Sequence, residues 1–312
     1  MTFVSEQLCS ILSTVLWILA VPPLLVGTIR KTKARLQNRI GAPLWQPFID
    51  IAKLLRKEET LSETTSWMFR FSAVILMTIS LLLAATAPWI LPKFALAPCD
   101  IFFLLYSLAT FRFFTLLLAL DASSPFGTFA ASREATLSFL AEPAAALSLA
   151  ALAVRAHTSD LNLIFGQSAP DSPILWLLSG SAFLLASLVD LSRMPIDDPT
   201  THLELTMVHE ALILESSGRN LGLIEGATWL KLAILLGLSC QCYLHAFPKV
   251  YQGSPVVLAC ISVISLVFTG LVLGTFESLT VKLHWRKAPE FIAYALTMAF
   301  VASIAALGTG VI

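Results

Sequence analysis

Long apolar stretches, separated by shorter polar segments, fill most of the 312 residues of the chain. Eight of them reach the length of about 20 residues that a helix needs to cross the hydrocarbon core of a membrane. The pattern predicts an all-α integral membrane protein, in which residues 1–312 form a single transmembrane domain, a bundle of about eight helices. The stretches lie at residues 8–29, 68–91, 100–120, 135–155, 173–191, 226–246, 254–276 and 290–311.

A further helix is predicted between the first two spans. From Leu44 to Glu59 the apolar side chains recur at the spacing of one helix face, and charged side chains occupy the rest of the helix surface. The segment is too short to cross, so we expect an amphipathic helix that lies along the cytoplasmic interface of the bilayer. Its apolar positions are Trp45, Phe48, Ile49, Ala52 and Leu55.

Composition excludes several classes of protein. Apolar residues make up 57% of the chain and charged residues 13%, whereas soluble domains have about 45–50% and about 25%. Twenty basic and 20 acidic side chains cancel, so no net field attracts nucleic acid. The five cysteines and the histidines His202 and His209 match no zinc or redox motif. We therefore expect this chain to bind no metal and no cofactor and to carry no catalytic residue of its own.

The basic residues set the expected orientation. Polar loops at residues 30–67, 121–134, 192–225 and 277–289 lie on one side of the predicted bundle. Fifteen of the 20 Lys and Arg residues fall in or beside these loops, and three fall in the links on the other side. The positive-inside rule places the loops in the cytoplasm, so both termini are expected outside.

Several ionisable side chains lie inside the predicted spans or end them. Such a group costs several kcal/mol in a membrane, so it normally faces the protein interior or water and marks a functional site. Glu142 lies inside the fourth span, and Arg112 in the third needs a counter-ion, for which Asp100 and Asp121 are the options. The expected proton path or coupling array comprises Glu142, Asp190, Asp197, Asp198, Glu204, Glu210, Glu215, Glu225, Lys231 and Glu277.

Ordered motifs connect the chain with a known family. R-x-Q-x-R-x-G-x-P occupies residues 35–43, and D-x-x-K-L-x-x-K-E occupies residues 50–58. This segment resembles the first cytoplasmic loop of the membrane subunit of respiratory complex I (NADH dehydrogenase subunit 1, the NuoH family). The motifs L-D-x-x-S-P-F at 120–126, A-S-R-E at 131–134 and E-P at 142–143 are more similar to the HycD-type membrane subunit of formate hydrogenlyase and other energy-converting group 4 nickel–iron hydrogenases.

The resemblance implies a membrane anchor and coupling subunit of a complex-I-like oxidoreductase in the cytoplasmic membrane of a bacterium or archaeon. Electron transfer in a docked cytoplasmic module of cluster-bearing and hydrogenase-like subunits would drive H⁺ or Na⁺ movement together with antiporter-like membrane subunits. Iron–sulfur clusters, and a nickel–iron centre where one exists, would belong to those partners, because they need several thiolates. The residues expected to dock the module are Arg35, Gln37, Arg39, Asp121, Arg133, Glu134 and Arg193.

Three other functions fit the same residues. The chain could be the quinone-site subunit of a respiratory NADH dehydrogenase, with neighbouring genes for NADH-binding and quinone-site subunits. It could be a stand-alone secondary transporter, which would move ions as an isolated chain. It could also be a purely structural anchor whose buried charges only pair, so that replacing Glu142 would impair assembly and leave coupling unchanged.

Overall fold

The computed structural model describes residues 2–62, 65–92, 95–166, 172–197, 208–247, 255–283 and 285–308. Over these ranges the chain is helical apart from turns and one isolated β-bridge. Eight of the described helices are long and apolar enough to cross a membrane, which confirms the predicted architecture. They are α1 (Thr2–Leu36), α3 (Trp67–Thr86), α4 (Ile101–Asp121), α5 (Pro125–Ala156), α7 (Pro173–Asp190), α9 (Gly218–His245), α10 (Pro255–Leu279) and α11 (Ala288–Gly308).

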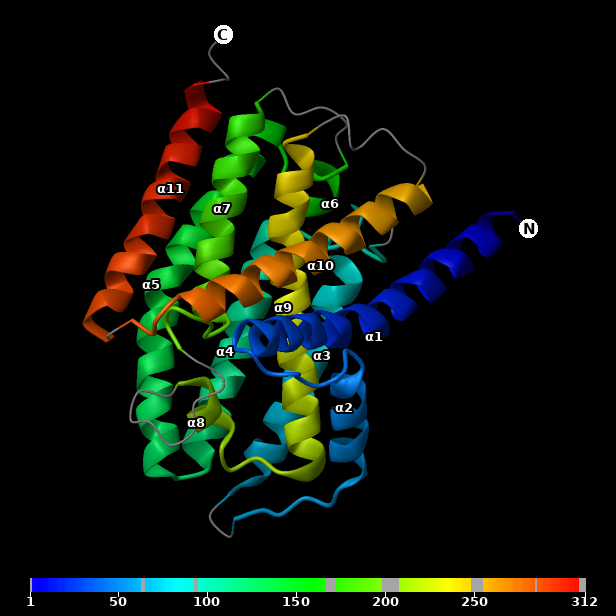
Figure 1. Cartoon of the computed structure of the whole chain (residues 1–312). Coiled ribbons are helices and arrows are strands. Elements are labelled where there is room, and N and C mark those ends of the chain that lie inside the picture. The colour runs from blue at the N-terminus through cyan, green and yellow to red at the C-terminus, as the bar shows by residue number, and fades with distance from the viewer. Residues whose placement is uncertain are drawn as a thin grey trace.

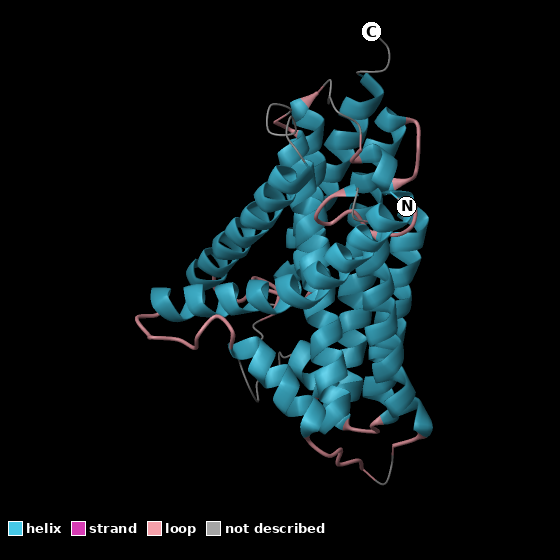
Figure 2. Ribbon diagram, turned by 90° about the vertical axis from the view of Figure 1, so that its right-hand side faces the viewer, coloured by secondary structure: helices cyan, strands magenta, loops and turns pink. Residues whose placement is uncertain are grey.

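Helix α9 forms the centre of the bundle. It is the most enclosed of the spans described, and its most apolar window is 78% buried. Helices α3, α5, α7 and α11 run up the picture in Figure 1 beside α9, whereas α1 and α10 cross in front of it at a steep angle. Figure 2 shows the same two helices projecting away from the main bundle. The core therefore lies around α9, and α1 and α10 enclose one side of it.

Small residues allow α1 and α10 to approach closely. A side chain on Gly270 would come within 2.6 Å of Leu25 of α1, and one on Gly274 would come within 3.0 Å of Thr32. Glycines four residues apart let two transmembrane helices pack backbone against backbone. This G-x-x-x-G spacing on α10 holds the C-terminal half of α1 in place, with its basic last turns beside the end of α10.

Two spans begin earlier than the apolar pattern predicts. Helix α5 begins at Pro125 instead of near residue 135, and α9 begins at Gly218 instead of near residue 226. Proline at the first helical position costs no hydrogen bond, because that N–H has no partner within the helix. The extra turns are polar and helical, so hydropathy alone places these boundaries too late.

The predicted amphipathic helix is present as α2 (Gln46–Arg56). It packs on α9 through Ile51 and Leu54, which lie against Gly226 and Gly222. The predicted apolar face is turned outward, since Trp45 is 63% exposed. Its location at the bilayer surface stays a prediction. Three short helices complete the described part of the chain: α6 (Leu161–Ile164), α8 (His209–Ile213) and the 3-10 turn at Trp285–Lys287.

Candidate functional site

Charged side chains from α4, α7 and α9 meet inside the bundle. Asp190 is the last residue of α7, and its Oδ1 and Oδ2 atoms lie 3.0 Å from Arg112 Nε and 2.8 Å from Lys231 Nζ. Lys231 also donates to the backbone carbonyl of Asp190 at 3.0 Å. A carbonyl in the last turn of a helix has no partner within the helix, and a cation there is favoured by the helix dipole. The carboxylate at the end of α7 thus forms ion pairs with two cations, Arg112 and Lys231.

Arg112 extends this network to α5. Its Nη1 atom lies 2.7 Å from Oε1 of Glu142, so one guanidinium contacts two carboxylates. The prediction that Asp100 or Asp121 is the counter-ion of Arg112 is wrong. Both lie at the ends of α4, roughly 14–18 Å along the helix from Arg112 at about 1.5 Å per residue. Asp100 instead accepts a hydrogen bond from Phe102 N at 2.8 Å and so caps α4.

Glu134 lies next to this network in a different environment. It is buried on α5 and accepts hydrogen bonds from Ser192 Oγ at 3.1 Å and from Ser138 Oγ at 3.3 Å. Within the described ranges no basic side chain lies at ion-pair distance from it. Glu134 is therefore held by hydroxyl groups, whereas Glu142 and Asp190 are held by cations.

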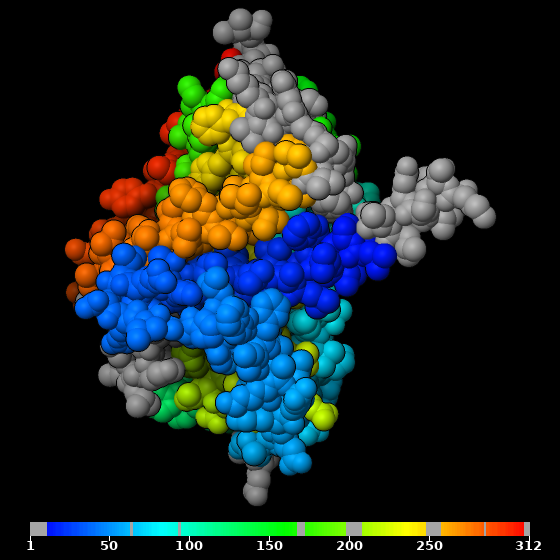
Figure 3. Space-filling view, turned by 45° about the vertical axis from the view of Figure 1, so that its right-hand side comes forward, coloured from blue at the N-terminus to red at the C-terminus, as the bar shows by residue number. Residues whose placement is uncertain are grey.

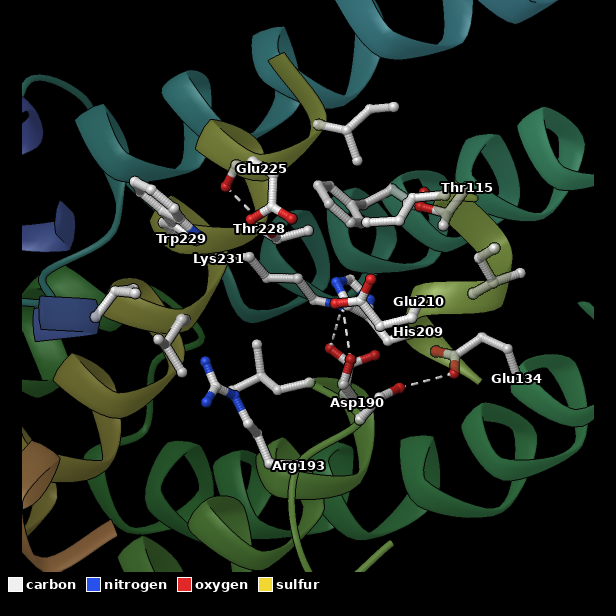
Figure 4. A pocket seen from close by; sticks show the side chains of 18 of the residues that line it. Thr115, Glu134, Asp190, Arg193, His209, Glu210, Glu225, Thr228, Trp229 and Lys231 are labelled. Atoms are coloured by element: carbon white, nitrogen blue, oxygen red, sulfur yellow. Dashed lines mark hydrogen bonds and ion pairs between the residues drawn. The ribbon is translucent and has the colours of Figure 1, made fainter. Parts of the chain in front are cut away.

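Two cavities meet at the Arg112–Asp190 pair. The larger one, with about 1110 Å³ of empty space including its open mouth, lies between α1, α4, α5, α8 and α9. Figure 4 shows Asp190, Lys231 and Glu225 projecting into it. The smaller one, of about 340 Å³, reaches Glu142 from the opposite side of the pair. The ionisable residues that line the larger cavity are Arg30, Lys33, Arg112, Glu134, Asp190, Arg193, His209, Glu210, Glu225 and Lys231.

A second charge cluster ties the segment after α7 to α10. The side chain of Glu277 is fully buried between Lys33 Nζ at 3.2 Å and Arg193 Nη1 at 3.3 Å. Asp197 lies 2.8 Å from Lys282 Nζ and accepts from the backbone N–H of Val208 at 2.8 Å. Separating a buried carboxylate from its partners would leave its charge buried without compensation, which is strongly destabilising. These contacts therefore hold α1, α10 and the start of α8 together.

The structure places the expected site residues in several different environments. Glu142, Asp190 and Lys231 share the network described above, and Glu277 and Asp197 form the second cluster. Glu210 and Glu225 line the larger cavity, and Glu215 is exposed on the surface. Asp198 and Glu204, together with His202, lie outside the described residues.

The expected docking residues are also divided. Arg35, Gln37 and Arg39 are exposed at the end of α1. Asp121 accepts hydrogen bonds from Ser66 N at 2.9 Å and Ser66 Oγ at 2.7 Å, which joins the start of α3 to the end of α4. The remaining three residues lie elsewhere: the guanidinium of Arg133 is 3.9 Å from the ring of Phe129, and Glu134 and Arg193 line the cavity.

Sequence reasoning missed two kinds of residue. Lys33 lies within a run of cations that predicts an anchor on lipid headgroups, so nothing in the pattern marks it as the partner of a buried carboxylate. Ser192 and Ser138 carry no charge, and hydroxyl groups of this kind are common in helices. No three His, Cys, Asp or Glu side chains in the described ranges lie close enough to hold a metal ion.

These features define a multi-pass helical membrane protein with a network of ionisable groups buried between its helices and bordered by cavities. The chain belongs to the NADH dehydrogenase family of subunit 1 type, whose sequence profile matches residues 9–307. This confirms the resemblance that its motifs indicate.

Two relatives from Escherichia coli (strain K12) are similar to the chain. Hydrogenase-4 component C is 32% identical over 247 residues, which cover 78% of this chain and 76% of the relative. Formate hydrogenlyase subunit 4 is 29% identical over 303 residues, which cover 92% and 95%. A chain in the structure of the membrane-bound sulfane sulfur reductase, an archaeal respiratory membrane complex, has the same fold. It matches with a TM-score of 0.79 at 18% identity, covering 96% of this chain and 99% of that one.

Proposed function

We propose that this chain is the membrane anchor and coupling subunit of an energy-converting oxidoreductase of the hydrogenase or formate hydrogenlyase type. The observation that carries the proposal is the position of Arg112, which contacts Glu142 and Asp190 at once and lies between two cavities. The two relatives support it, since both are named as parts of hydrogenase-4 and formate hydrogenlyase.

The network can respond to a proton. Two cations, Arg112 and Lys231, balance two carboxylates, Glu142 and Asp190. A proton on either carboxylate removes its attraction for Arg112 and leaves the guanidinium with the other one. Arg112 is then the element with two arrangements that coupling between distant sites requires. The carboxyl of Glu134, held only by hydroxyl groups, lies next to this centre and is the proposed site where a proton enters from the larger cavity.

The exit of the path is proposed at Glu142. Its side chain is 43% exposed although it lies well inside α5. A carboxylate that faced lipid there would cost several kcal/mol. We therefore place a neighbouring membrane subunit of the antiporter-like class on this flank, where it receives the H⁺ or Na⁺ pathway.

The cytoplasmic module is proposed to dock on the opposite end. The exposed residues Arg35, Gln37 and Arg39 lie there, close in sequence to Lys33, which pairs with Glu277. Arg193 contacts the same carboxylate, and the segment that it begins leads to Asp197 and α8. A movement of the docked module would reach Asp190 through this connection, because Arg193 follows the end of α7 by three residues. The clusters that carry electrons belong to the partners.

Mild extraction of the complex tests the anchoring role. The chain should co-purify with iron-containing cytoplasmic subunits and with antiporter-like membrane subunits. The isolated chain in liposomes should move no H⁺ or Na⁺, which distinguishes this function from a stand-alone transporter. Recovery of the chain without any iron-containing partner, under conditions that keep other membrane complexes intact, would contradict the proposal.

A further inference from the structure

One face of α2 is left uncovered by the rest of the described chain. Trp45 is 63% exposed, Ile49 is 51% exposed and Phe48 is 38% exposed. The opposite face of the helix packs on α9 through Ile51 and Leu54. Figure 3 shows the residues around α2, in lighter blue, as an open part of the surface next to α1. Exposed aromatic and aliphatic side chains grouped in this way mark a surface that contacts a membrane or a binding partner.

Cations lie beside this apolar surface. Lys53, Arg56 and Lys57 are exposed, and together with Phe48, Ile49 and Ala52 they line a shallow groove. None of the three has an ion-pair partner in the described part of the chain. Asp50, the one carboxylate of α2, is already in contact with Gln46 at 3.0 Å and Arg30 at 3.5 Å. The groove is therefore apolar along one side and cationic at its end.

The charge of the whole segment fits an anionic occupant. Residues 30–57 contain eight Lys and Arg and one acidic residue, Asp50, so their formal charge is +7. A partner that covers α2 has to bring negative charge and apolar surface together. A phospholipid with an anionic headgroup has both, and its phosphate and acyl chains are separated in the same way as the two parts of the groove.

We propose that this groove binds an anionic phospholipid of the cytoplasmic leaflet. Its acyl chains cover Phe48, Ile49 and Ala52, and its phosphate lies between Lys53, Arg56 and Lys57. Each cation close to an anionic lipid surface strengthens binding by about fivefold. Loss of all three should therefore weaken binding by roughly 100-fold. None of these residues belongs to the Arg112 network. The result of the lipid-binding test is therefore independent of whether the chain couples electron transfer to ion movement.

Native mass spectrometry of the full chain in detergent tests the site. Phosphatidylglycerol and phosphatidylcholine with identical acyl chains are titrated against the unchanged chain and against the triple variant K53Q/R56Q/K57Q. The matched control R219Q/R286Q/K287Q removes three exposed cations elsewhere. Phosphatidylglycerol should bind in preference to phosphatidylcholine, weaken by roughly 100-fold in the triple variant, and change by less than about threefold in the control. Equal binding of the two lipids, or equal losses in the two variants, would overturn the proposal.

Three further measurements separate the lipid from other occupants. Inorganic phosphate at millimolar concentration should not displace phosphatidylglycerol, and displacement would show that a free anion suffices. The variant F48S/I49S keeps every cation and should still weaken lipid binding, and unchanged binding would contradict the apolar half of the site. In the assembled complex, amine labelling of Lys53 and Lys57 should fall only when phosphatidylglycerol is present. Protection in phosphatidylcholine alone would assign the groove to a protein partner.

Discussion

Replacing Asp190 by asparagine perturbs the centre of the network with little change in shape. The variant D190N leaves Lys231 buried beside an uncharged amide, while Arg112 keeps Glu142 at 2.7 Å. Removing one partner of a buried ion pair costs about 3–5 kcal/mol, because the other charge stays buried without compensation. Lys231 retains the backbone carbonyl of residue 190, so we expect the lower end, about 3 kcal/mol.

Thermal unfolding of the detergent-solubilised chain, followed by tryptophan fluorescence, measures this loss. At about 2–4 °C per kcal/mol, Tm should fall by roughly 6–12 °C. The double variant D190N/K231M removes the uncompensated cation and should recover at least half of that fall, which a double-mutant cycle reports as a coupling energy. A Tm within about 2 °C of the unchanged chain for D190N, or a further fall in the double variant, would refute the assigned contact between Asp190 and Lys231.

Three other variants or treatments test separate parts of the structure. Gly237→Ala should lower Tm by several degrees, because its Cβ would lie 2.6 Å from a backbone oxygen after α3, whereas Gly226→Ala, with nothing closer than 3.7 Å, should be neutral or stabilising. Cys99 lies outside the spans, and burial raises the pKa of its thiol to about 12. Iodoacetamide should therefore leave Cys99 unmodified at pH 8, modify it after unfolding in detergent, and react faster only as the pH approaches 12; rapid reaction of the native chain at pH 8 would contradict this. Glu277→Gln removes the buried carboxylate that both Lys33 and Arg193 contact and should cost about 3 kcal/mol by thermal unfolding, whereas the exposed Glu290→Gln should change stability by less than about 0.5 kcal/mol; equal effects would contradict the second cluster.

The eight spans are predictable from sequence because each one is a continuous apolar segment of the chain. In lipid, every backbone N–H and C=O group of a spanning segment must be hydrogen-bonded within the protein. A sufficiently long apolar run therefore forms a transmembrane helix. The boundaries are less predictable. Pro125 begins α5 about ten residues before the apolar stretch, because capping and proline geometry decide where a helix starts.

The pairing of charges depends on which helices are neighbours, and a linear pattern does not contain that information. Arg112 needs a counter-ion on any reading, but the choice of Glu142 and Asp190 follows from the packing of α4 on α5, which in turn packs on α7. The same holds for Lys33, whose place in a run of cations predicts contact with lipid headgroups, whereas the structure pairs it with Glu277 of α10.

The exposed face of α2 illustrates the same limit. Periodicity predicts an amphipathic helix with Trp45 and Phe48 on its apolar side, and the helix is present. Which side packs on the protein depends on Gly222 of α9, where an added Cβ would lie 3.1 Å from Leu54, so the missing side chain lets Leu54 lie against the α9 backbone. A small residue on a distant helix thus selects the buried face.

The ratio of ions moved to electrons transferred, in vesicles that contain the whole complex, tests the coupling role most directly. We expect E142Q to assemble and to transfer electrons at about the normal rate, because Glu142 contacts Arg112 and no redox group of this chain. Its H⁺ or Na⁺ uptake per electron should fall by at least about tenfold, while E290Q, which changes an exposed carboxylate at the start of α11, should keep the normal ratio. An unchanged ratio in an intact E142Q complex would contradict the account.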